Sequence, residues 1–468
     1  MLRRLLDSPW TYFAAAGLLL LVAVATQFGV RLPARPQGSV EEIASLAGRK
    51  DLNVVFVLVD TLRADRVGSY GYPRPTTPNI DALGEHGIVF ERVLSQSSWT
   101  KTSMASLWTA TFPLHNGMVR YDDVLPPAAN LPAEVFREAG FRTAGIWRNG
   151  WVAPNFGFDQ GFEFYTNPQP GRARARIERG NPSTARLQGT DEDVATSAFE
   201  FIEAYGRERF LLYLHLMDLH QYVYDDKSEH FGTSYSDVYD QSLNWTDRVI
   251  GAVVAKLEEV GVLGRTIVVV ASDHGEAFLE HGLEGHARNL YQEVVRVPLV
   301  MALPFRLPEG IRVKEQVSNI DIWPTILDLV GLPPLPDVDG RSLVPAILAA
   351  ARGENDGASP RALFSHLDRR WGKSRKESDP LVAVSDGSLR LFLPLNAPER
   401  AELYDHATDL GEQKNLAGER TAERDRLEQE ARSHVEQSKI PWGEAPSQIE
   451  LDELRLNQLR ALGYVVGQ

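Results

Sequence analysis

Acidic and imidazole side chains follow three apolar segments of this chain. Asp60 comes directly after the apolar residues 53–59, and Asp273 and His274 come just after residues 266–271. Asp218 and His220 follow the apolar residues 210–214. A carboxylate beside an imidazole suits a divalent cation, and such a cation can activate a nucleophile. The alternatives are a helix N-cap for Asp60 and a structural ion pair for Asp273 and His274.

The apolar segments themselves read as buried strands. Residues 53–59 and 266–271 are rich in β-branched side chains, as expected of strands that are covered on both faces in a parallel sheet. Helices are predicted between the strands, over residues 191–205 and 236–260. This alternation predicts an open α/β sheet, and ligands of such sheets bind beyond the carboxyl ends of the strands. The polar residues gather at those ends, which predicts a site there.

The pattern changes after residue 332. A proline-rich stretch begins at Pro333, and residues 381–393 alternate around an Asp386-Gly387 dipeptide that is typical of a hairpin. A charged helical tail follows. We therefore predict a catalytic α/β domain over residues 51–332 and a smaller C-terminal α+β subdomain over residues 333–468, with a small antiparallel sheet.

The first residues predict a membrane anchor. The segment from Trp10 to Val30 has no charged residue and matches the roughly 20 residues that span a bilayer. We predict an uncleaved anchor over residues 1–31, a linker over residues 32–50, and a catalytic domain outside the cytoplasm, in the periplasm or on the cell surface. A cleaved signal peptide is the alternative.

Composition and charge exclude several classes of protein. The chain has 468 residues, of which 43% are hydrophobic and 24% are charged, as in ordinary globular proteins. It has no cysteine, which excludes disulfides, thiolate metal sites and a cysteine nucleophile. The 49 basic and 63 acidic residues give a net charge of −14, which argues against nucleic acid as a partner.

Several short motifs together resemble the sulfatase family of the alkaline phosphatase superfamily. They occur in the family's order over roughly residues 51 to 416. They are Val57-Leu-Val-Asp-Thr-Leu-Arg-Ala-Asp65, Thr77-Pro-Asn-Ile-Asp81, Ser98-Trp-Thr-Lys-Thr-Ser-Met-Ala-Ser106, His215-Leu-Met-Asp-Leu-His220, Ser272-Asp-His-Gly-Glu276, His281-Gly-Leu-Glu-Gly-His286, Tyr291-Gln-Glu-Val-Val-Arg-Val-Pro298, Asp321-Ile-Trp-Pro-Thr325, and Glu402-Leu-Tyr-Asp405 with Asn415-Leu416.

The resemblance implies a fold and a mechanism. The fold is a large mixed, mostly parallel sheet flanked by helices, with a smaller C-terminal α+β domain. In the mechanism, a side chain at the head of a helix attacks sulfur or phosphorus in line. A divalent cation lowers the pKa of this nucleophile and offsets the charge of the transferred group.

The stretch that resembles the sulfatase nucleophile motif departs from it. Sulfatases carry Cys/Ser-x-Pro-x-Arg, and the first residue is oxidised to formylglycine. Here the first position is Thr100, the proline is replaced by Thr102, and the arginine is replaced by Met104. Formylglycine chemistry is therefore not expected. Threonine at this place resembles the phosphoethanolamine and phosphoglycerol transferases of the superfamily. A capping role for Thr100 is compatible with catalysis, because helix starts favour anions.

The resemblance carries over to single residues. It implies a metal site of Asp60, Thr100, Asp273 and His274, with Thr61 where a second acidic ligand is usual. The cation could be zinc, manganese, calcium or magnesium. Thr100 also matches the nucleophile. His220 matches a residue that contacts the transferred group, and His286 could bind the anion or help to hold a second cation. Lys101 could replace part of the missing arginine charge; a solvated lysine is the alternative.

We therefore predict a metal-dependent hydrolase of a sulfuric or phosphoric ester. The substrate would be an anionic ester on a glycan, a lipid head group or a small molecule. A head-group transferase and a non-catalytic binding protein with a degenerate site are the two alternatives. The arginine-rich segment from Gly171 to Arg186 is either a solvated loop or a contact for an anionic substrate or lipid.

Overall fold

The computed structural model describes residues 35–168, 176–177, 189–354, 361–373 and 375–450. The predicted anchor at residues 1–31 lies outside this part, and so does the arginine-rich segment, apart from a short strand at Arg176–Ile177. Within the described ranges, no helix is both long and apolar enough to cross a membrane.

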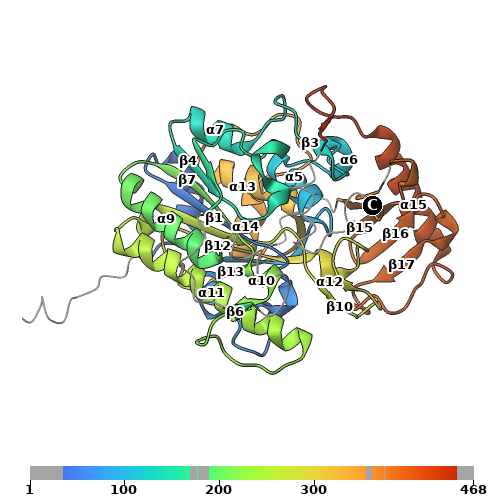
Figure 1. Cartoon of the computed structure of the whole chain (residues 1–468), viewed down its shortest axis with the longest axis horizontal. Helices are drawn as coiled ribbons and strands as arrows, with labels where there is room; N and C mark the ends of the chain where they lie inside the picture. The colour runs from blue at the N-terminus through green and yellow to red at the C-terminus, as the bar shows by residue number, and fades with distance from the viewer. Residues whose placement is uncertain (1–34, 169–175, 178–188, 355–360, 374, 451–468) are drawn as a thin grey trace, which may run out of the picture.

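An eight-stranded sheet forms the centre of the molecule (Figure 1). The third strand in its order is antiparallel to both neighbours, and all other neighbours pair in parallel. The predicted mixed, mostly parallel sheet is thus confirmed. The strands in spatial order are β13 (Ile311–Ser318), β2 (Ile88–Leu94), β12 (Arg296–Ala302), β9 (Thr266–Ala271), β1 (Asn53–Val59), β7 (Phe210–Leu216), β4 (Arg142–Ile146) and β5 (Phe164–Thr166).

The three central strands are the apolar segments that the sequence marked as strands. Every residue of β1, β7 and β9 is buried. In register, Val54 lies between Leu211 of β7 and Ile267 of β9. Because these parallel strands end at one edge of the sheet, the residues that follow β1, β7 and β9 are brought to the same place.

Helices cover both faces of the sheet. Phe201 and Ile202 are two of the apolar side chains that the helices bury, and each contributes roughly 1.5–3 kcal/mol through burial. One face packs against α5 (Thr100–Thr109), α7 (Pro132–Glu138), α13 (Ile322–Leu329) and α14 (Val344–Ala351). The other packs against α4 (Pro78–Glu85), α9 (Asp191–Tyr205) and α11 (Tyr235–Glu259).

The C-terminal part forms a second, antiparallel sheet, as predicted. Its order is β14 (Leu363–Asp368), β15 (Pro380–Asp386), β16 (Leu389–Pro394) and β17 (Glu402–Asp405), and α15 (Thr421–Gln437) packs on it. The predicted hairpin turns at Gly387, whose φ of +63° favours glycine. The backbone N–H of His366 donates to the carbonyl of Gln96 and joins the two sheets (2.8 Å). The exact boundary at residue 332 stays a prediction.

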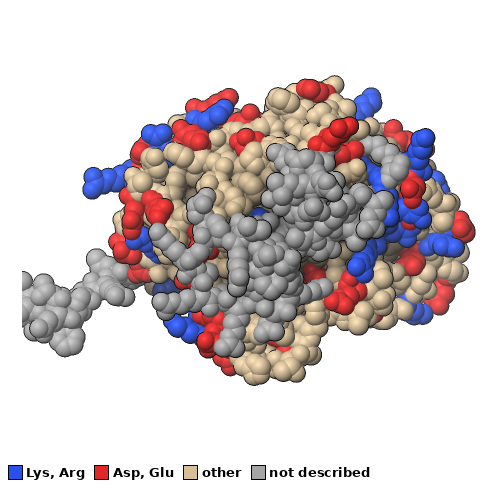
Figure 2. All heavy atoms as spheres, in the orientation of Figure 1, with Lys and Arg blue, Asp and Glu red and all other residues tan. Residues whose placement is uncertain are grey.

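Short elements complete the described chain. Those that follow β7 and β9, beyond the carboxyl ends of these strands, are α10 (Asp218–Gln221), β10 (Ala277–Phe278), β11 (Glu284–Gly285) and α12 (Gln292–Val295). The others include α3 (Val40–Ser45), α6 (Pro113–Asn116), β3 (Asp123–Val124), β8 (Val223–Tyr224) and β18 (Ser447–Gln448). On the face drawn in Figure 2, acidic and basic side chains are interspersed, and basic ones gather over the C-terminal part.

Candidate active site

Three predicted metal ligands meet at the carboxyl edge of the central sheet. Asp60 follows β1, and Asp273 and His274 follow β9, its neighbour. One ligand atom from each of these residues lies within 4.8 Å of those from the other two. All three side chains are completely buried. The sheet therefore delivers two carboxylates and one imidazole to a single point.

Two carboxylate oxygens at this point carry lone pairs that no described group satisfies. Asp60 Oδ1 and Asp273 Oδ2 are buried and have no hydrogen-bond partner among the described residues. His274 Nδ1 lies 2.9 Å from the carbonyl oxygen of Gly275, which can only accept, so Nδ1 carries the proton. The other ring nitrogen, His274 Nε2, then presents a lone pair at 3.3 Å from Asp273 Oδ2 and 3.8 Å from Asp60 Oδ1. Such a set of donors fits a cation.

Burial and mutual repulsion govern the ionisation of these ligands. Burial, followed by the charge of Asp60, raises the pKa of Asp273 to about 8. Burial also raises the pKa of Asp60, but the hydrogen bond from His215 and the nearby imidazoles outweigh it and hold that pKa well below its usual range. Burial lowers the pKa of His274, which keeps its ring neutral and able to bind a metal.

Thr100 lies against this cluster at the first residue of α5. Its side chain is completely buried, and Oγ1 lies 3.1 Å from His274 Nε2. The residue before it, Trp99, has extended backbone, so the helix begins at Thr100, beside the cluster. A helix start favours negative charge, which suits both an ionised hydroxyl and an anionic substrate.

Two residues of the site were missed by the sequence analysis. Asn149 Nδ2 donates to Asp60 Oδ2 (2.6 Å) and to Thr100 Oγ1 (3.4 Å), so it positions both side chains. His215 Nε2 donates to Asp60 Oδ2 (3.2 Å), and its other ring nitrogen bonds to the Tyr213 hydroxyl. Asn149 comes soon after β4, and His215 lies near the end of β7. Both are therefore polar residues at the carboxyl end of a strand, which is the signal that identified Asp60.

Two histidines lie next to the buried cluster. The ring of His286 is 4.5 Å from that of His274 and 5.0 Å from that of His220. Both His220 and His286 are partly exposed, in contrast to the ligands beneath them. Glu276 Oε2 accepts a hydrogen bond from His286 Nδ1 (2.8 Å) and orients that ring. Burial lowers the pKa of His220 to about 4, so its ring is neutral at pH 7.

Comparison with known proteins agrees with this arrangement. The Sulfatase family model matches residues 52–332, more than half of the chain. The chain belongs to the sulfatase family. A second model, N-sulphoglucosamine sulphohydrolase, C-terminal, matches residues 280–439. As a member of this family, the protein is a hydrolase that acts on sulfuric or phosphoric esters.

The relatives and structural neighbours of this sulfatase-family protein are distant. It is 28% identical to arylsulfatase A of Homo sapiens over 444 residues, which covers 80% of this chain and 85% of that protein. It is 27% identical to N-acetylgalactosamine-6-sulfatase of Canis lupus familiaris, covering 63% and 66%. The phosphonate monoester hydrolase of Agrobacterium radiobacter has a similar fold, with a TM-score of 0.65, 18% identity, and coverage of 83% and 96%. A 2-O GAG sulfatase has a TM-score of 0.69, 18% identity, and coverage of 89% and 97%.

Lys101 of this sulfatase-family protein is buried rather than solvated. Its Nζ donates to the carbonyl of Tyr121 (2.7 Å) and lies 3.6 Å from the centre of the Phe156 ring. These contacts direct the ammonium group toward Tyr121 and Phe156. A part for Lys101 in catalysis stays a prediction. Met104, where sulfatases have arginine, is also completely buried.

Asp218 does not have spare oxygen atoms for a second cation. One carboxylate oxygen pairs with Arg148, and the other accepts from the backbone N–H of Asp191 and from Trp245 Nε1. These contacts do not favour Asp218 as a ligand of the second cation that His286 could help to hold. A capping role is supported instead, because Asp218 and Asp191 each accept from the backbone N–H of the other.

Thr61 lies in a strained conformation beside the cluster. Its φ of +63° is in the left-handed region, which is rare for a β-branched residue. Its hydroxyl donates to the Asp60 carbonyl (2.6 Å), and its backbone N–H donates to Asp273 Oδ1 (3.4 Å). Backbone strain of this kind costs roughly 1–3 kcal/mol and is typical of functional sites.

Proposed function

We propose that this protein is a metal-dependent hydrolase in which the Thr100 hydroxyl is the nucleophile. The observation that carries the proposal is the position of Thr100 Oγ1, 3.1 Å from His274 Nε2 at the start of a helix. The chain has no cysteine that could be converted to formylglycine. A threonine hydroxyl needs activation to act as a nucleophile, and the neighbouring carboxylates suggest how it is obtained.

The metal ligands in this proposal are Asp60, Thr100, Asp273 and His274. The unpartnered oxygens of Asp60 and Asp273 and the lone pair of His274 Nε2 fit a divalent cation. Two carboxylates with one imidazole suit zinc or manganese better than calcium or magnesium. When bound, the cation would lower the pKa of the Thr100 hydroxyl and offset negative charge on the transferred group.

The protein's own groups then account for the reaction in two steps. Thr100 Oγ releases its proton to water and forms a bond to phosphorus or sulfur, while the bond to the leaving oxygen breaks and that oxygen takes a proton from water to leave as the alcohol. His220 donates an N–H group to an oxygen of the transferred group or the leaving alcohol, and His286 lies beside it with its Nδ1 hydrogen bonded to Glu276. Asn149 holds Thr100 and Asp60 in their relative positions. Water then displaces Thr100 and releases the acid, which regenerates the hydroxyl.

We infer that the protein hydrolyses phosphoric esters in preference to sulfuric esters. Thr100 stands where sulfatases have a residue that becomes formylglycine, and Met104 replaces the arginine. The ester would be carried by a glycan, a lipid head group or a small molecule. The names of the relatives and neighbours include both sulfatases and a phosphonate monoester hydrolase, so both ester classes need testing.

Comparison of Thr100 variants tests the nucleophile. Full-length protein is supplied with zinc, manganese, calcium or magnesium and assayed on an aryl sulfate, a phosphate monoester, a phosphate diester and a phosphonate monoester. Thr100→Ala should lower kcat by at least about a thousandfold, and Thr100→Ser should retain part of the rate. Thr109→Ala is a matched control at the other end of α5, where the hydroxyl bonds to the Ala105 carbonyl.

Each result of this assay has a distinct meaning. An undiminished rate in Thr100→Ala would refute the nucleophile. Transfer to an added acceptor alcohol that exceeds transfer to water would favour a head-group transferase. Folded protein that takes up no divalent cation would favour a binding protein with a degenerate site.

We also propose that residues 1–31 anchor the protein in a membrane with the catalytic domain outside the cytoplasm. The uncharged segment from Trp10 to Val30 supports this proposal. Cell fractionation of the full chain tests it, because recovery of the protein in the supernatant after membrane sedimentation would contradict an uncleaved anchor.

A further inference from the structure

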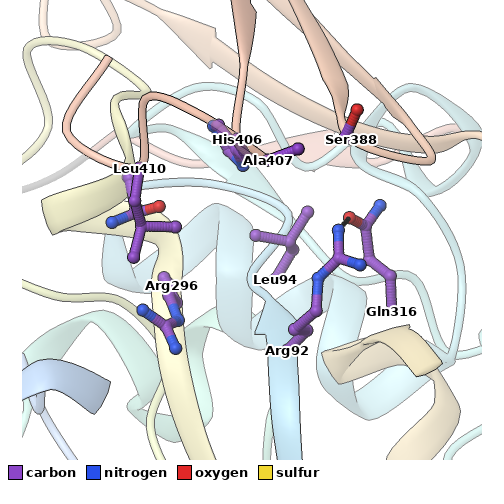
Figure 3. Close-up of a pocket in the computed structure, with 9 residues that line it drawn as sticks. Arg92, Leu94, Arg296, Gln316, Ser388, His406, Ala407 and Leu410 are labelled. Carbon is purple, nitrogen blue, oxygen red and sulfur yellow. Dashed lines mark hydrogen bonds between the residues drawn. The ribbon is translucent and has the colours of Figure 1, made fainter. Parts of the chain in front are cut away.

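A second pocket lies between the large sheet and the C-terminal sheet (Figure 3). It encloses about 290 Å³, close to the lower end of the volumes of small-molecule sites. Strands β2, β12 and β13 form one side, and the loops before β16 and after β17 form the other. The polar residues that line it are Arg92, Gln292, Arg296, Gln316, Ser388 and His406.

Two arginines contribute positive charge to this pocket. Arg92 donates to Gln316 Oε1 (2.8 Å) and to the Gly387 carbonyl (2.8 Å), and Arg296 donates to the Glu91 carbonyl (3.4 Å). Neither guanidinium has a carboxylate oxygen within 4.0 Å among the described residues. Burial and the charge of Arg296 lower the pKa of Arg92, and no acidic group offsets them. In a chain with a net charge of −14, two such arginines in one cavity are unusual.

The acidic groups near the pocket already have other partners. Glu91 pairs with Arg312 (2.7 Å), and Asp65, whose charge interacts with Arg296, pairs with Arg63 (2.7 Å). Glu412 accepts from His406 Nε2 (2.7 Å) and from the backbone N–H of Gln292 (2.7 Å). Their negative charges are thus committed to other donors. A ligand with negatively charged oxygens would supply the missing counter-charge for Arg92 and Arg296.

The pocket shares a chain segment with the metal centre. The backbone N–H of Gly275, next to His274, donates to the carbonyl of Val294 (2.9 Å). Gln292 and Arg296, two residues to either side of Val294, line the pocket. The residues 292–296 therefore contact the metal-ligand loop on one side and the pocket on the other, although the two sites have no lining residue in common.

We propose that this pocket is an oxyanion site, separate from the metal centre, that binds a sulfate, phosphate or carboxylate group through Arg92 and Arg296. The anion is either a second charged group of an extended substrate or a free ion in solution. The site does not depend on Thr100 or on a bound cation, so its existence is independent of the proposed hydrolysis.

Titration calorimetry with sodium sulfate tests the site directly. Full-length protein is used at constant ionic strength with a chelator present, so that no cation assists binding at the metal centre. We expect saturable binding of one sulfate. Arg92→Gln and Arg296→Gln should each weaken it by about tenfold or more, because each removes charge-assisted hydrogen bonds. Arg142→Gln, at an arginine on β4 whose side chain is 40% exposed, and Thr100→Ala should leave it unchanged.

Because Arg92 also joins the two sheets, the melting temperature of each variant is measured first. Arg92→Lys keeps the charge but loses the planar fork, and its affinity should fall between those of the wild type and Arg92→Gln. Equal sulfate affinity in the wild type and in folded Arg92→Gln and Arg296→Gln would overturn the proposal. Absence of sulfate binding by the wild type would overturn it as well.

Kinetic comparison then separates the two sources of the anion. If the pocket takes a second group of the substrate, Arg92→Gln should raise KM for a disulfated disaccharide about tenfold but leave KM for a monosulfated one unchanged. If it takes a free ion, both KM values should be unchanged while sulfate binding is still weakened. If the metal centre hydrolyses phosphoric esters, a bisphosphorylated and a monophosphorylated sugar replace the sulfated pair, and the same differences in KM are expected.

Discussion

Two buried clusters of this molecule each contain two aspartates, and they differ in how the negative charge is offset. Beside α10, Asp191 and Asp218 share Arg148, and each of their four carboxylate oxygens has a hydrogen-bond donor. At the proposed metal centre, no described arginine or lysine pairs with Asp60 or Asp273, and one oxygen of each has no partner among the described residues.

The difference separates a structural cluster from a functional one. Buried carboxylates are costly unless they are paired and hydrogen-bonded. The chain itself supplies a cation to the Asp191–Asp218 cluster, so that cluster is complete after folding. Among the described residues it supplies no arginine or lysine to the Asp60–Asp273 cluster, whose unpartnered carboxylate oxygens fit a cation from solution. Both clusters lie near the same edge of the sheet, so burial alone did not distinguish them.

The largest expected effect is that of Asp273→Asn at the metal centre. Loss of a ligand charge should abolish stoichiometric binding of the divalent cation and lower kcat/KM by at least about a thousandfold. With a chelator present, the variant should melt no lower than the wild type at pH 7, because burial and the charge of Asp60 raise the pKa of Asp273 to about 8 and asparagine resembles the resulting neutral carboxyl. Metal analysis, kinetics and calorimetry measure these effects.

An Asp→Asn change in the Asp191–Asp218 cluster is the control for Asp273→Asn. Asp191→Asn should retain the cation, since Asp191 is paired with Arg148 instead (2.7 Å). If Asp191→Asn lost the cation, or if Asp273→Asn kept both the cation and the activity, the distinction between the clusters would be wrong.

Arg148→Met should destabilise the protein by about 3–5 kcal/mol, whether or not the cation is present. The change leaves Asp191 and Asp218 buried without their counter-charge, which is the costly way to break a buried ion pair. Arg142→Met is the matched control, because that side chain is 40% exposed and its loss should cost less than about 1 kcal/mol. Denaturant unfolding compares them, and equal midpoints would contradict the structural role of Arg148.

The stability of the protein should depend on pH because the single positive charge of Arg148 is shared by two carboxylates, those of Asp191 and Asp218. Burial and the charge of Asp218 raise the pKa of Asp191 to about 7, above its value in the unfolded chain. Between pH 4 and 7 the folded state thus holds a proton that the unfolded state releases, and this contribution to stability is lost as the pH rises through 7.

Asp191→Asn removes that titration. The free energy of unfolding of the variant, relative to the wild type, should therefore increase with pH by up to about 1.4 kcal/mol per pH unit across this window. Denaturant unfolding at several pH values measures the difference. A difference that stays constant between pH 4 and 7 would show that Asp191 is ionised throughout.

The sequence predicted the sheet and part of the site, for physical reasons that can be traced to single residues. An uninterrupted apolar run such as residues 53–59 indicates a strand that is buried on both faces of a parallel sheet. Because the carboxyl ends of such strands meet at one edge, Asp60 and Asp273 are predicted to lie close together. Asn149 and His215 were missed because an amide after a short strand and a histidine within an apolar one carry weak signals. The pairing of Arg148 with Asp218 depends on side-chain packing between β4 and α10, which no local pattern encodes.

The strain at Thr61 leads to the smallest expected effect, a change in metal preference. The sequence resemblance predicts that Thr61 occupies the place of the second acidic ligand of sulfatases, and its φ of +63° is one that aspartate and asparagine tolerate better than threonine. Thr61→Asp should add a carboxylate to the site. Calcium and magnesium prefer oxygen ligands, so the ratio of calcium to zinc affinity should rise by about tenfold.

Thr61→Asn separates the charge from the backbone effect, because it offers a similar shape without a negative charge. Competition between calcium and zinc, followed by titration calorimetry, measures the ratio for both variants. A shift in Thr61→Asp alone would show that a missing carboxylate sets the metal preference. An equal shift in both would attribute it to relief of strain at residue 61. Unchanged ratios in both would mean that the side chain of residue 61 is not directed at the cation, and that Asp60, Asp273 and His274 determine the preference.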